Sequence, residues 1–424
     1  MSTPAVSLRN VNRSGILIRA LIIMLSAGIV NAPSIFVTPL SALKGWDAEA
    51  VASAATLMGT FTVVGHFFGG ILLSKIGSKL TTALGGLFIC LAFVGTALVP
   101  AATPALLNVT YGAFFGMGVG FSYTPATYTA ISWFPDKRGL ASGLCMACNG
   151  GSASFLAPIC ANLVNVIGVE MAMILIGIIL GGIILICSVS GFQQAPEGYV
   201  PAGYVPPASI GDETQLESWP AARAMKSRAF WQIALCLAAM PILYVVAYPR
   251  FTLFMTNAGI DTSYATMGVT VYAIANVAGR LGLGRLIDKT SYKFTYIWCT
   301  MFSILASLVM MRANSVGLFY LAYALLGIGF GATNCVYPVA ISKSFGPKYG
   351  GSIYGTGMWA YMIFATLLMP QVNSAIVAAT GSWNLVFAIA IILNLISLAS
   401  MLLIPKVDTS NWSYESPIIL PWSI

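Results

Sequence analysis

Long apolar stretches, separated by short groups of charges, prolines and glycines, dominate the pattern of this chain. Each stretch reaches the length of about 18–20 residues that an α-helix needs to cross a bilayer. The pattern predicts twelve spanning helices, over residues 15–39, 48–73, 80–100, 103–132, 139–165, 168–190, 229–256, 264–287, 293–311, 315–342, 349–378 and 384–405.

A long Pro-rich segment separates the sixth span from the seventh and holds four of the twelve acidic residues. This break predicts four parts: an N-terminal six-helix bundle over residues 1–190, a central cytoplasmic loop over 191–227, a C-terminal six-helix bundle over 228–406 and a tail over 407–424. We assign no role to the tail.

The loops of the two halves resemble each other at matching places. "GGILLSKIGSK" (69–79) follows the second span and "LGRLIDKTSYK" (283–293) follows the eighth. "WFPDKRGLASG" (133–143) follows the fourth span and "SFGPKYGGSIYG" (344–355) follows the tenth. Basic loops with glycines can look alike by composition alone, but two repeated loops favour a duplicated six-helix unit, as in many alternating-access carriers.

Composition agrees with this pattern: 58% of the 424 residues are hydrophobic and 8% are charged, against about a quarter charged in a soluble domain. The sequence therefore predicts an all-α membrane protein. With the N-terminus inside, sixteen Lys and Arg face the cytoplasm, and only Lys44, Arg250 and Arg312 face the other side. The positive-inside rule then places both termini in the cytoplasm. The net charge of +8 follows from this orientation, so we expect no nucleic-acid partner.

Cysteine and histidine give no sign of a metal centre. Cys145 and Cys148 have CxxC spacing, but no second Cys or His cluster accompanies them, and a zinc site needs about four such ligands. All eight cysteines lie in apolar stretches, where we expect them to pack. With one histidine and no acid deep in any span, no catalytic constellation is present. We expect neither a cofactor nor an enzyme.

Arg280 stands in "ANVAGRLGLGRLIDK" (275–289), about 25 Å along the eighth helix at 1.5 Å per residue. Arginine deep in a bilayer is costly, so it almost always faces a bundle interior and marks a pathway. Its guanidinium matches a carboxylate in a bidentate pair. The alternative is that Arg280 snorkels toward the cytoplasmic surface, where Arg285 lies about one turn nearer.

Twelve helices, a long central loop and loops of the GxLxDxxG type resemble the major facilitator superfamily, with two pseudo-symmetric six-helix bundles. "WFPDKRGLASG" is similar to a loop of oxalate/formate antiporter-like carriers and of monocarboxylate transporters. The resemblance implies that Arg280 binds a substrate carboxylate, because both groups place an essential arginine here. Ser74 departs from the pattern, since an Asp is usual there, while Asp288 fills the corresponding place in the second half.

Asn276 lies one turn before Arg280 on the same helical face, where it can orient the guanidinium or bind substrate. Monocarboxylate transporters typically carry an Asp at this position, so the obvious proton acceptor is absent here. The related carriers place further cations near what are Ser34 and Tyr361 in this chain. One fixed positive charge favours a monoanion over a dicarboxylate.

Further substrate-binding candidates are the polar and aromatic residues in the middle of helices that line the superfamily's pore: Asn31, Tyr123, Asn149, Tyr272, Phe330, Asn334 and Tyr361. Tyr123 resembles a tyrosine that oxalate carriers set against the substrate. For each of them, packing or an interhelical hydrogen bond is the alternative.

His66 is the only histidine and the candidate for carrying a proton, with a neutral packing role as the alternative. The charged residues of the repeated loops, Asp288, Lys137, Arg138 and Lys348, are the predicted gate.

The predicted function is alternating-access transport of a small monocarboxylate, with L-lactate as the best guess by resemblance and a proton as companion. We expect a monomer in a bacterial inner membrane. Two alternatives stay open: an anion exchanger of the oxalate/formate type, and a membrane sensor that binds an anion without moving it.

Overall fold

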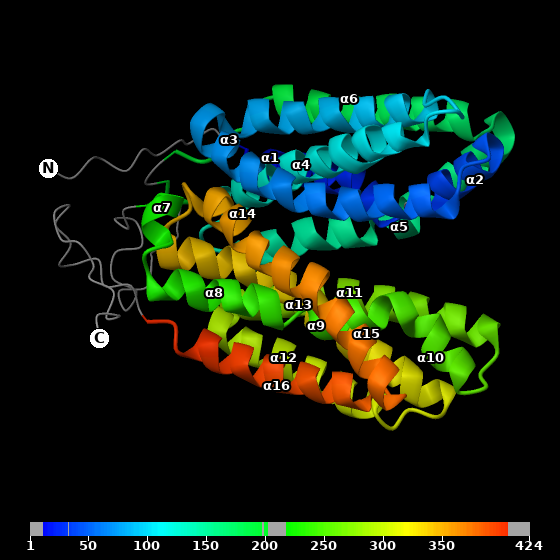
Figure 1. Ribbon diagram of the computed structural model, residues 1–424. Coiled ribbons are helices and arrows are strands. Elements are labelled where there is room, and N and C mark those ends of the chain that lie inside the picture. The colour runs from blue at the N-terminus through cyan, green and yellow to red at the C-terminus, as the bar shows by residue number, and fades with distance from the viewer. Residues whose placement is uncertain (1–11, 33, 197–198, 202–217, 406–424) are drawn as a thin grey trace, which may run out of the picture. The chain divides into compact units, whose positions relative to one another are not determined.

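The computed structural model describes residues 12–405 except 33, 197–198 and 202–217 (Figure 1). The predicted tail at 407–424 and part of the predicted central loop lie outside the described residues. Every regular element in the described part of the chain is helical. The prediction of an all-α membrane protein with twelve spanning helices is confirmed. Within the described residues, ten helical segments are long and apolar enough to cross a membrane. One of them, Ser53–Ala97, covers most of the second and third predicted spans, and α11, which carries Arg280 and Arg285, is less apolar.

Six spans form the N-terminal half. Their elements are α1 (Arg13–Ala27), η1 (Gly28–Asn31), α2 (Ser34–Lys44), α3 (Ala48–Ala97), η2 (Pro104–Leu106), η3 (Asn108–Phe115), α4 (Gly116–Trp133), α5 (Arg138–Ile167) and α6 (Val169–Val189). The short α7 (Ala221–Ala224) lies within the predicted central loop.

Six further spans form the C-terminal half. Their elements are α8 (Arg228–Ala239), α9 (Ile242–Ala247), η4 (Tyr248–Arg250), α10 (Phe251–Asn257), α11 (Thr262–Lys289), α12 (Tyr292–Met310), α13 (Val316–Phe345), α14 (Gly350–Ala360), η5 (Tyr361–Leu368), α15 (Met369–Thr380) and α16 (Asn384–Leu402).

The second and third predicted spans are the two legs of α3, which meet at a single residue. Gly77 has φ 80° and ψ 171°, a backbone conformation that glycine adopts without steric cost. Both legs pack against α4, since a Cβ added at Gly69 would lie 3.1 Å from the carbonyl oxygen of Gly120, and one at Gly85 would lie 2.3 Å from Oγ of Ser122. The chain therefore reverses direction at Gly77.

The first span of each half is interrupted. In the N-terminal half, the 3₁₀ turn η1 separates α1 from α2. In the C-terminal half, α8 ends before Met240 and Pro241, and the 3₁₀ turn η4 separates α9 from α10. Discontinuous helices at corresponding places in two repeats are typical of transporter binding sites, because interrupted backbone offers polar groups to a ligand.

Two stretches of π-helix also occur, at η3 in the fourth span and η5 in the eleventh. A π-helix holds more residues per turn than an α-helix, and such stretches are frequent at functional sites. Tyr361, one of the predicted site residues, is the first residue of η5.

Contacts between Cα atoms divide the chain into two compact units. The N-terminal unit comprises residues 1–135 and 144–204, and the C-terminal unit comprises residues 136–143 and 205–424. The connection after α4 and the first turns of α5 thus belong by their contacts to the C-terminal unit.

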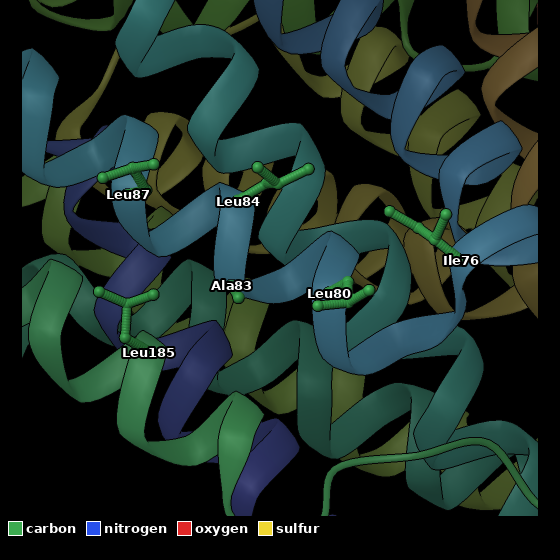
Figure 2. Close-up of a pocket in the computed structure, with 6 residues that line it drawn as sticks. All are labelled: Ile76, Leu80, Ala83, Leu84, Leu87 and Leu185. Carbon is green, nitrogen blue, oxygen red and sulfur yellow. The ribbon is translucent and has the colours of Figure 1, made fainter.

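The outer surface of the N-terminal unit carries a shallow apolar depression. Figure 2 shows its lining: Ile76, Leu80, Ala83, Leu84 and Leu87 of α3, and Leu185 of α6. No polar side chain lines it, and Leu80 and Leu87 are exposed. Such a surface suits contact with lipid tails.

Candidate functional site

Close contact between α11 and α13 fixes the backbone of the principal candidate site in the C-terminal unit. A Cβ added at Gly331 would lie 2.3 Å from the carbonyl oxygen of Asn276, and one at Gly327 would lie 2.6 Å from that of Tyr272. Small residues let spanning helices approach this closely. The glycines of α13 therefore set the position of the helix face that carries Asn276 and Arg280.

Arg280 and Asn276 are both buried on this face of α11, with 9% and 5% of their surface exposed. Burial of Arg280 favours a side chain inside the bundle over one that snorkels to the surface. Asn276 donates a hydrogen bond from Nδ2 to the hydroxyl of Tyr272, at 3.2 Å. The i, i+4 spacing brings Tyr272, Asn276 and Arg280 onto one stripe of the helix.

An aromatic cluster of Tyr244, Tyr248, Tyr272 and Phe330 adjoins this stripe. The ring of Tyr244 is stacked on Phe330, with centroids 3.9 Å apart and planes 8° apart. Tyr248 and Tyr244 approach Tyr272 at 4.8 Å and 5.9 Å between centroids. Tyr272 belongs both to this cluster and to the stripe that holds Arg280. The cluster thus sets flat apolar faces and phenolic hydroxyls beside the stripe that carries the buried cation.

The structure brings Tyr272, Phe330 and Tyr361, three of the predicted candidates, into one packed cluster. Tyr361 and Phe330 are partly buried against the same core as Tyr272. Asn334 lies one turn beyond Phe330 on α13 and donates its Nδ2 to the Phe330 carbonyl at 3.1 Å. Its amide nitrogen is therefore engaged with its own helix.

Sequence reasoning missed Tyr244 and Tyr248, because aromatic residues in an apolar span usually pack. The available signal was Pro241 and Pro249, which bracket both tyrosines in the first span of the second half. Prolines interrupt a helix, and an interrupted span in a repeat is a pointer to a binding site.

In the N-terminal unit, Asn31 and Asn149 join α5 to the region around η1. Asn31 donates Nδ2 to the carbonyls of Gly28 and Asn149, each at 2.9 Å, and Asn149 donates Nδ2 to the carbonyl of Met24 at 3.3 Å. Both amide nitrogens satisfy backbone carbonyls near the interrupted first span. These contacts favour the alternative of an interhelical hydrogen bond for this pair.

His66 and Tyr123 lie together, where α3 and α4 approach at Gly65 and Gly120. The two rings meet edge to face, with centroids 4.8 Å apart and planes 74° apart. Nδ1 of His66 is 2.9 Å from Oγ1 of Thr124, and the hydroxyl of Tyr123 lies against Sδ of Met146. His66 is buried, with 5% exposed. Sequence reasoning gave no role to Thr124 or Met146.

Asp288, from the predicted gate, accepts two backbone hydrogen bonds at the start of α5, within the C-terminal unit. The amide of Gly139 donates to Oδ1 at 2.6 Å, and that of Leu140 donates to Oδ2 at 2.7 Å. A Cβ at Gly139 would lie 2.3 Å from the carbonyl oxygen of Gly284. The carboxylate thus caps a helix N-terminus, where negative charge is stabilising.

The three basic members of the predicted gate differ in their surroundings. Arg138 is buried, with 8% exposed, whereas Lys137 and Lys348 are exposed. Lys348 places Nζ 5.5 Å from the centroid of the Tyr349 ring. In the described part of the chain, no group of three His, Cys, Asp or Glu side chains is arranged to hold a metal ion.

In its described residues, this chain is an all-helical membrane protein of two units, each with an interrupted first span. The chain matches the family model of the Major Facilitator Superfamily over residues 19–370, so it belongs to this superfamily of transporters. The predicted fold and family are confirmed.

Curated relatives agree with this membership. An uncharacterised MFS-type transporter of Escherichia coli is 27% identical over 80% of this chain and 82% of its own length. The oxalate:formate antiporter of Oxalobacter formigenes is 26% identical over 92% of this chain and 90% of its own. Monocarboxylate transporter 12-B of Danio rerio is 24% identical over 85% of this chain and 80% of its own length.

Solved structures give the same fold. The fucose:proton symporter of Escherichia coli superposes with a TM-score of 0.69 at 12% identity, covering 92% of this chain and 98% of its own. A proton:xylose symporter gives a TM-score of 0.70 at 14% identity, and the match covers 93% of this chain and 96% of the symporter. These similarities concern the fold alone.

Proposed function

We propose that this protein transports a small monocarboxylate by alternating access, with Arg280 binding the carboxylate. The observation that carries the proposal is the burial of Arg280 on the stripe of α11 that also holds Asn276 and Tyr272, beside the aromatic cluster. The oxalate:formate antiporter and the monocarboxylate transporters among its relatives support a carboxylate as cargo. L-lactate is the first substrate to test.

The aromatic cluster suits a small anion with a compact apolar body. Aromatic faces supply contact area without charge, and tyrosine hydroxyls add hydrogen-bond donors. A monocarboxylate needs one cation, and among the predicted substrate-binding residues only Arg280 is cationic. A dicarboxylate would leave its second charge without a matching cation among these residues, at a large desolvation cost.

Charge neutralisation couples binding to movement in this mechanism. A buried guanidinium is costly to desolvate, and a bound carboxylate offsets that cost through a charge-assisted pair. The loaded carrier therefore reorients more readily than the empty one. A proton that travels with the anion would keep the cycle electroneutral, with His66 as the candidate side chain.

Asp288 holds one conformational state in this proposal. Its carboxylate accepts from Gly139 and Leu140 at the start of α5, so the state that forms these bonds is stabilised. The count of Lys and Arg places this end of α11 on the cytoplasmic side, with both termini inside, and we propose a bacterial inner membrane as the location. Maleimide labelling of Lys348→Cys and Lys44→Cys variants from either side of sealed vesicles checks the orientation.

Uptake of labelled L-lactate into proteoliposomes tests the carboxylate-binding role. Arg280→Ala is expected to reduce uptake at least 100-fold, and Arg280→Lys to recover little, because a lysine cannot reproduce the bidentate geometry. Arg285→Ala is the matched control: the same helix loses the same charge at an exposed position. Uptake by Arg280→Ala equal to that of Arg285→Ala would refute the proposal.

Anion exchange of the oxalate/formate type is the second candidate, supported by the relative from Oxalobacter formigenes. A symporter needs an imposed proton gradient and works into vesicles empty of anion. An exchanger needs an anion on the trans side instead. Measuring uptake with each condition supplied separately decides between the two.

A further inference from the structure

Two exposed lysines flank the reversal of α3 at Gly77. Lys75 lies two residues before this glycine and Lys79 lies two residues after it. Neither ammonium group is paired with a carboxylate among the described residues. The orientation proposed above places this turn on the cytoplasmic side. Two positive charges therefore stand at the level where α3 meets the headgroups of that leaflet.

The apolar depression of the N-terminal unit begins at the same turn. Lys79 directly precedes Leu80 of its lining and lies one helical turn before Ala83, on the same face of the second leg (Figure 2). From Gly77 to Leu87, the far end of the lining on α3, the leg rises about 15 Å at 1.5 Å per residue. A hydrocarbon core is about 30 Å thick, so the depression extends through about one leaflet.

The depression lies where α3 and α6 approach closely. A Cβ added at Gly86 would lie 2.8 Å from the carbonyl oxygen of Gly181, so no large side chain fits between the two helices at this level. Ala83, one turn before Gly86, adds only a methyl group to the lining, and Leu185 closes it from α6. The result is an entirely apolar groove, which suits a chain of methylene groups.

The two repeats use the lysine after this turn differently. Lys79 matches Lys293 in the repeated loops, and Lys293 donates Nζ to the Ile404 carbonyl at 2.6 Å, just after α16, the sixth span of its half. In the first repeat, Ser78 holds the chain after α6 instead, by donating Oγ to the Phe192 carbonyl at 3.3 Å. Lys79 is exposed. Its ammonium group is therefore available to a ligand from the membrane.

We propose that the depression, together with Lys75 and Lys79, binds one anionic phospholipid of the cytoplasmic leaflet. An acyl chain lies along the apolar lining, and the phosphate headgroup meets the two ammonium groups. Anionic lipids are attracted to basic residues beside the cytoplasmic ends of spanning helices. A zwitterionic lipid brings the same acyl chains without net charge, so it binds more weakly. The inference does not depend on the identity of the cargo.

Native mass spectrometry of the purified full-length protein, titrated with phosphatidylglycerol or with phosphatidylcholine of the same acyl chains, tests the headgroup contact. The wild type is expected to bind phosphatidylglycerol more tightly. The double variant Lys75→Gln/Lys79→Gln is expected to lose about 25-fold in this affinity, about fivefold for each lysine, and to bind phosphatidylcholine as before. Equal affinity of the wild type for the two lipids would overturn the proposal.

A matched control separates a defined site from general surface charge. The double variant Lys226→Gln/Lys289→Gln removes the same charge from exposed positions of the C-terminal unit. Phosphatidylglycerol affinity is expected to stay near the wild-type value in this variant. A loss equal to that of Lys75→Gln/Lys79→Gln would mean that the lipid responds to net charge alone, and the site would be refuted.

Filling the depression tests the contact with the acyl chain. Ala83→Trp places a large apolar side chain in the lining without changing the charge, and it is expected to weaken phosphatidylglycerol binding at least as much as the loss of one lysine. Leu91→Trp is the control, at an exposed position one turn beyond Leu87 on α3. Wild-type affinity in Ala83→Trp would show that no acyl chain occupies the depression.

Thermal stability gives a readout that does not involve transport. A ligand that binds only the folded protein raises its melting temperature, so phosphatidylglycerol is expected to do so more than phosphatidylcholine. This difference is expected to vanish in Lys75→Gln/Lys79→Gln and to persist in Lys226→Gln/Lys289→Gln. Its persistence in the first variant would contradict the site. The proposed transport function fails separately, if Arg280→Ala retains uptake.

Discussion

In the C-terminal unit, one helix carries a buried arginine, a buried amide and a helix-capping carboxylate: Arg280, Asn276 and Asp288 of α11. In the described part of the N-terminal unit, the buried polar residues are uncharged serines and threonines together with Asn149 and His66. Two repeats with the same six-helix plan thus differ in electrostatics. Fixed charge is therefore found on α11 of one unit, whereas the buried polar side chains described in the other unit carry no fixed charge.

The same contrast appears in the repeated loops. Asp288 accepts two amide hydrogen bonds at the start of α5, but the matching position in the first repeat is Ser74, which donates its hydroxyl to the Ile71 carbonyl of its own helix. A serine turned to its own backbone supplies no carboxylate to a partner helix. The capping contact is therefore present in one repeat and replaced in the other.

The largest effect is expected from changing a glycine of α13 that lets this helix lie close to α11, the helix that carries Asn276 and Arg280. In Gly331→Ala, the new methyl group would meet the Asn276 carbonyl oxygen at 2.3 Å, so α11 must shift. A displacement of about 1 Å in a site can cost about 100-fold in rate, and we expect a loss of lactate uptake of that order.

Gly181→Ala is the control for this prediction, since its Cβ would meet the Gly86 carbonyl oxygen at 2.7 Å in the other unit. Melting temperature checks that both variants lose comparable stability. A similar loss of uptake in both variants would contradict a special role for the close contact between α11 and α13.

Adding a second charge beside Arg280 sharpens the comparison further. In Asn276→Asp, the ionised carboxylate lies one turn from the guanidinium and competes with the substrate, so uptake at neutral pH is expected to fall about tenfold or more. Protonation of the introduced carboxyl removes the competitor. Uptake should therefore rise as pH falls, and a pH profile parallel to that of the wild type would contradict this explanation.

Changing the residue at the capping position of either repeat is expected to have a smaller effect. Asp288→Asn replaces two charge-assisted hydrogen bonds, each contributing about 1.5–3 kcal/mol, by weaker neutral ones. The state that contains the cap should lose population, measured as altered accessibility of Lys348→Cys to maleimide. Ser74→Asp in the otherwise unchanged protein is expected to shift accessibility in the opposite direction, because it gives the loop of the first repeat a carboxylate.

The smallest effect is expected at Asn373 in α15, where neither amide atom meets a partner among the described residues and 1% of the surface is exposed. Replacing an unsatisfied buried amide by an apolar side chain of similar shape removes its desolvation cost. Asn373→Leu should raise the free energy of unfolding by about 1 kcal/mol, seen as a higher melting temperature. Asn394→Leu, which breaks the bond from Nδ2 to the Ala390 carbonyl, provides the comparison.

Much of the fold was predictable, because hydrophobic length and loop repeats are strong signals in a membrane protein. The twelve spans, the interruption by a central loop and the family follow from them. Arg280 and Asn276 stood out because a cation and an amide at i, i+4 are rare in an apolar helix. The predicted roles of the individual site residues stay predictions.

Other features depend on packing that a single sequence does not display. Tyr244 stacks on Phe330 from a different helix, and the hydroxyl of Tyr123 reaches Met146 across two helices. Neither pairing has a fixed spacing along the chain. The side-chain amides of Asn31 and Asn149 likewise donate hydrogen bonds to backbone carbonyls that are far from them in the sequence.

Gly77 has a practical consequence for anyone who handles this protein. Because a single residue joins the two membrane-crossing legs of α3, we expect the connection to be too short to accept an inserted epitope, fluorescent domain or protease site. A residue with a Cβ must adopt a conformation that L-amino acids rarely accept. Because both legs also pack against α4, we expect them to move together, so that a probe attached to either leg reports the movement of both.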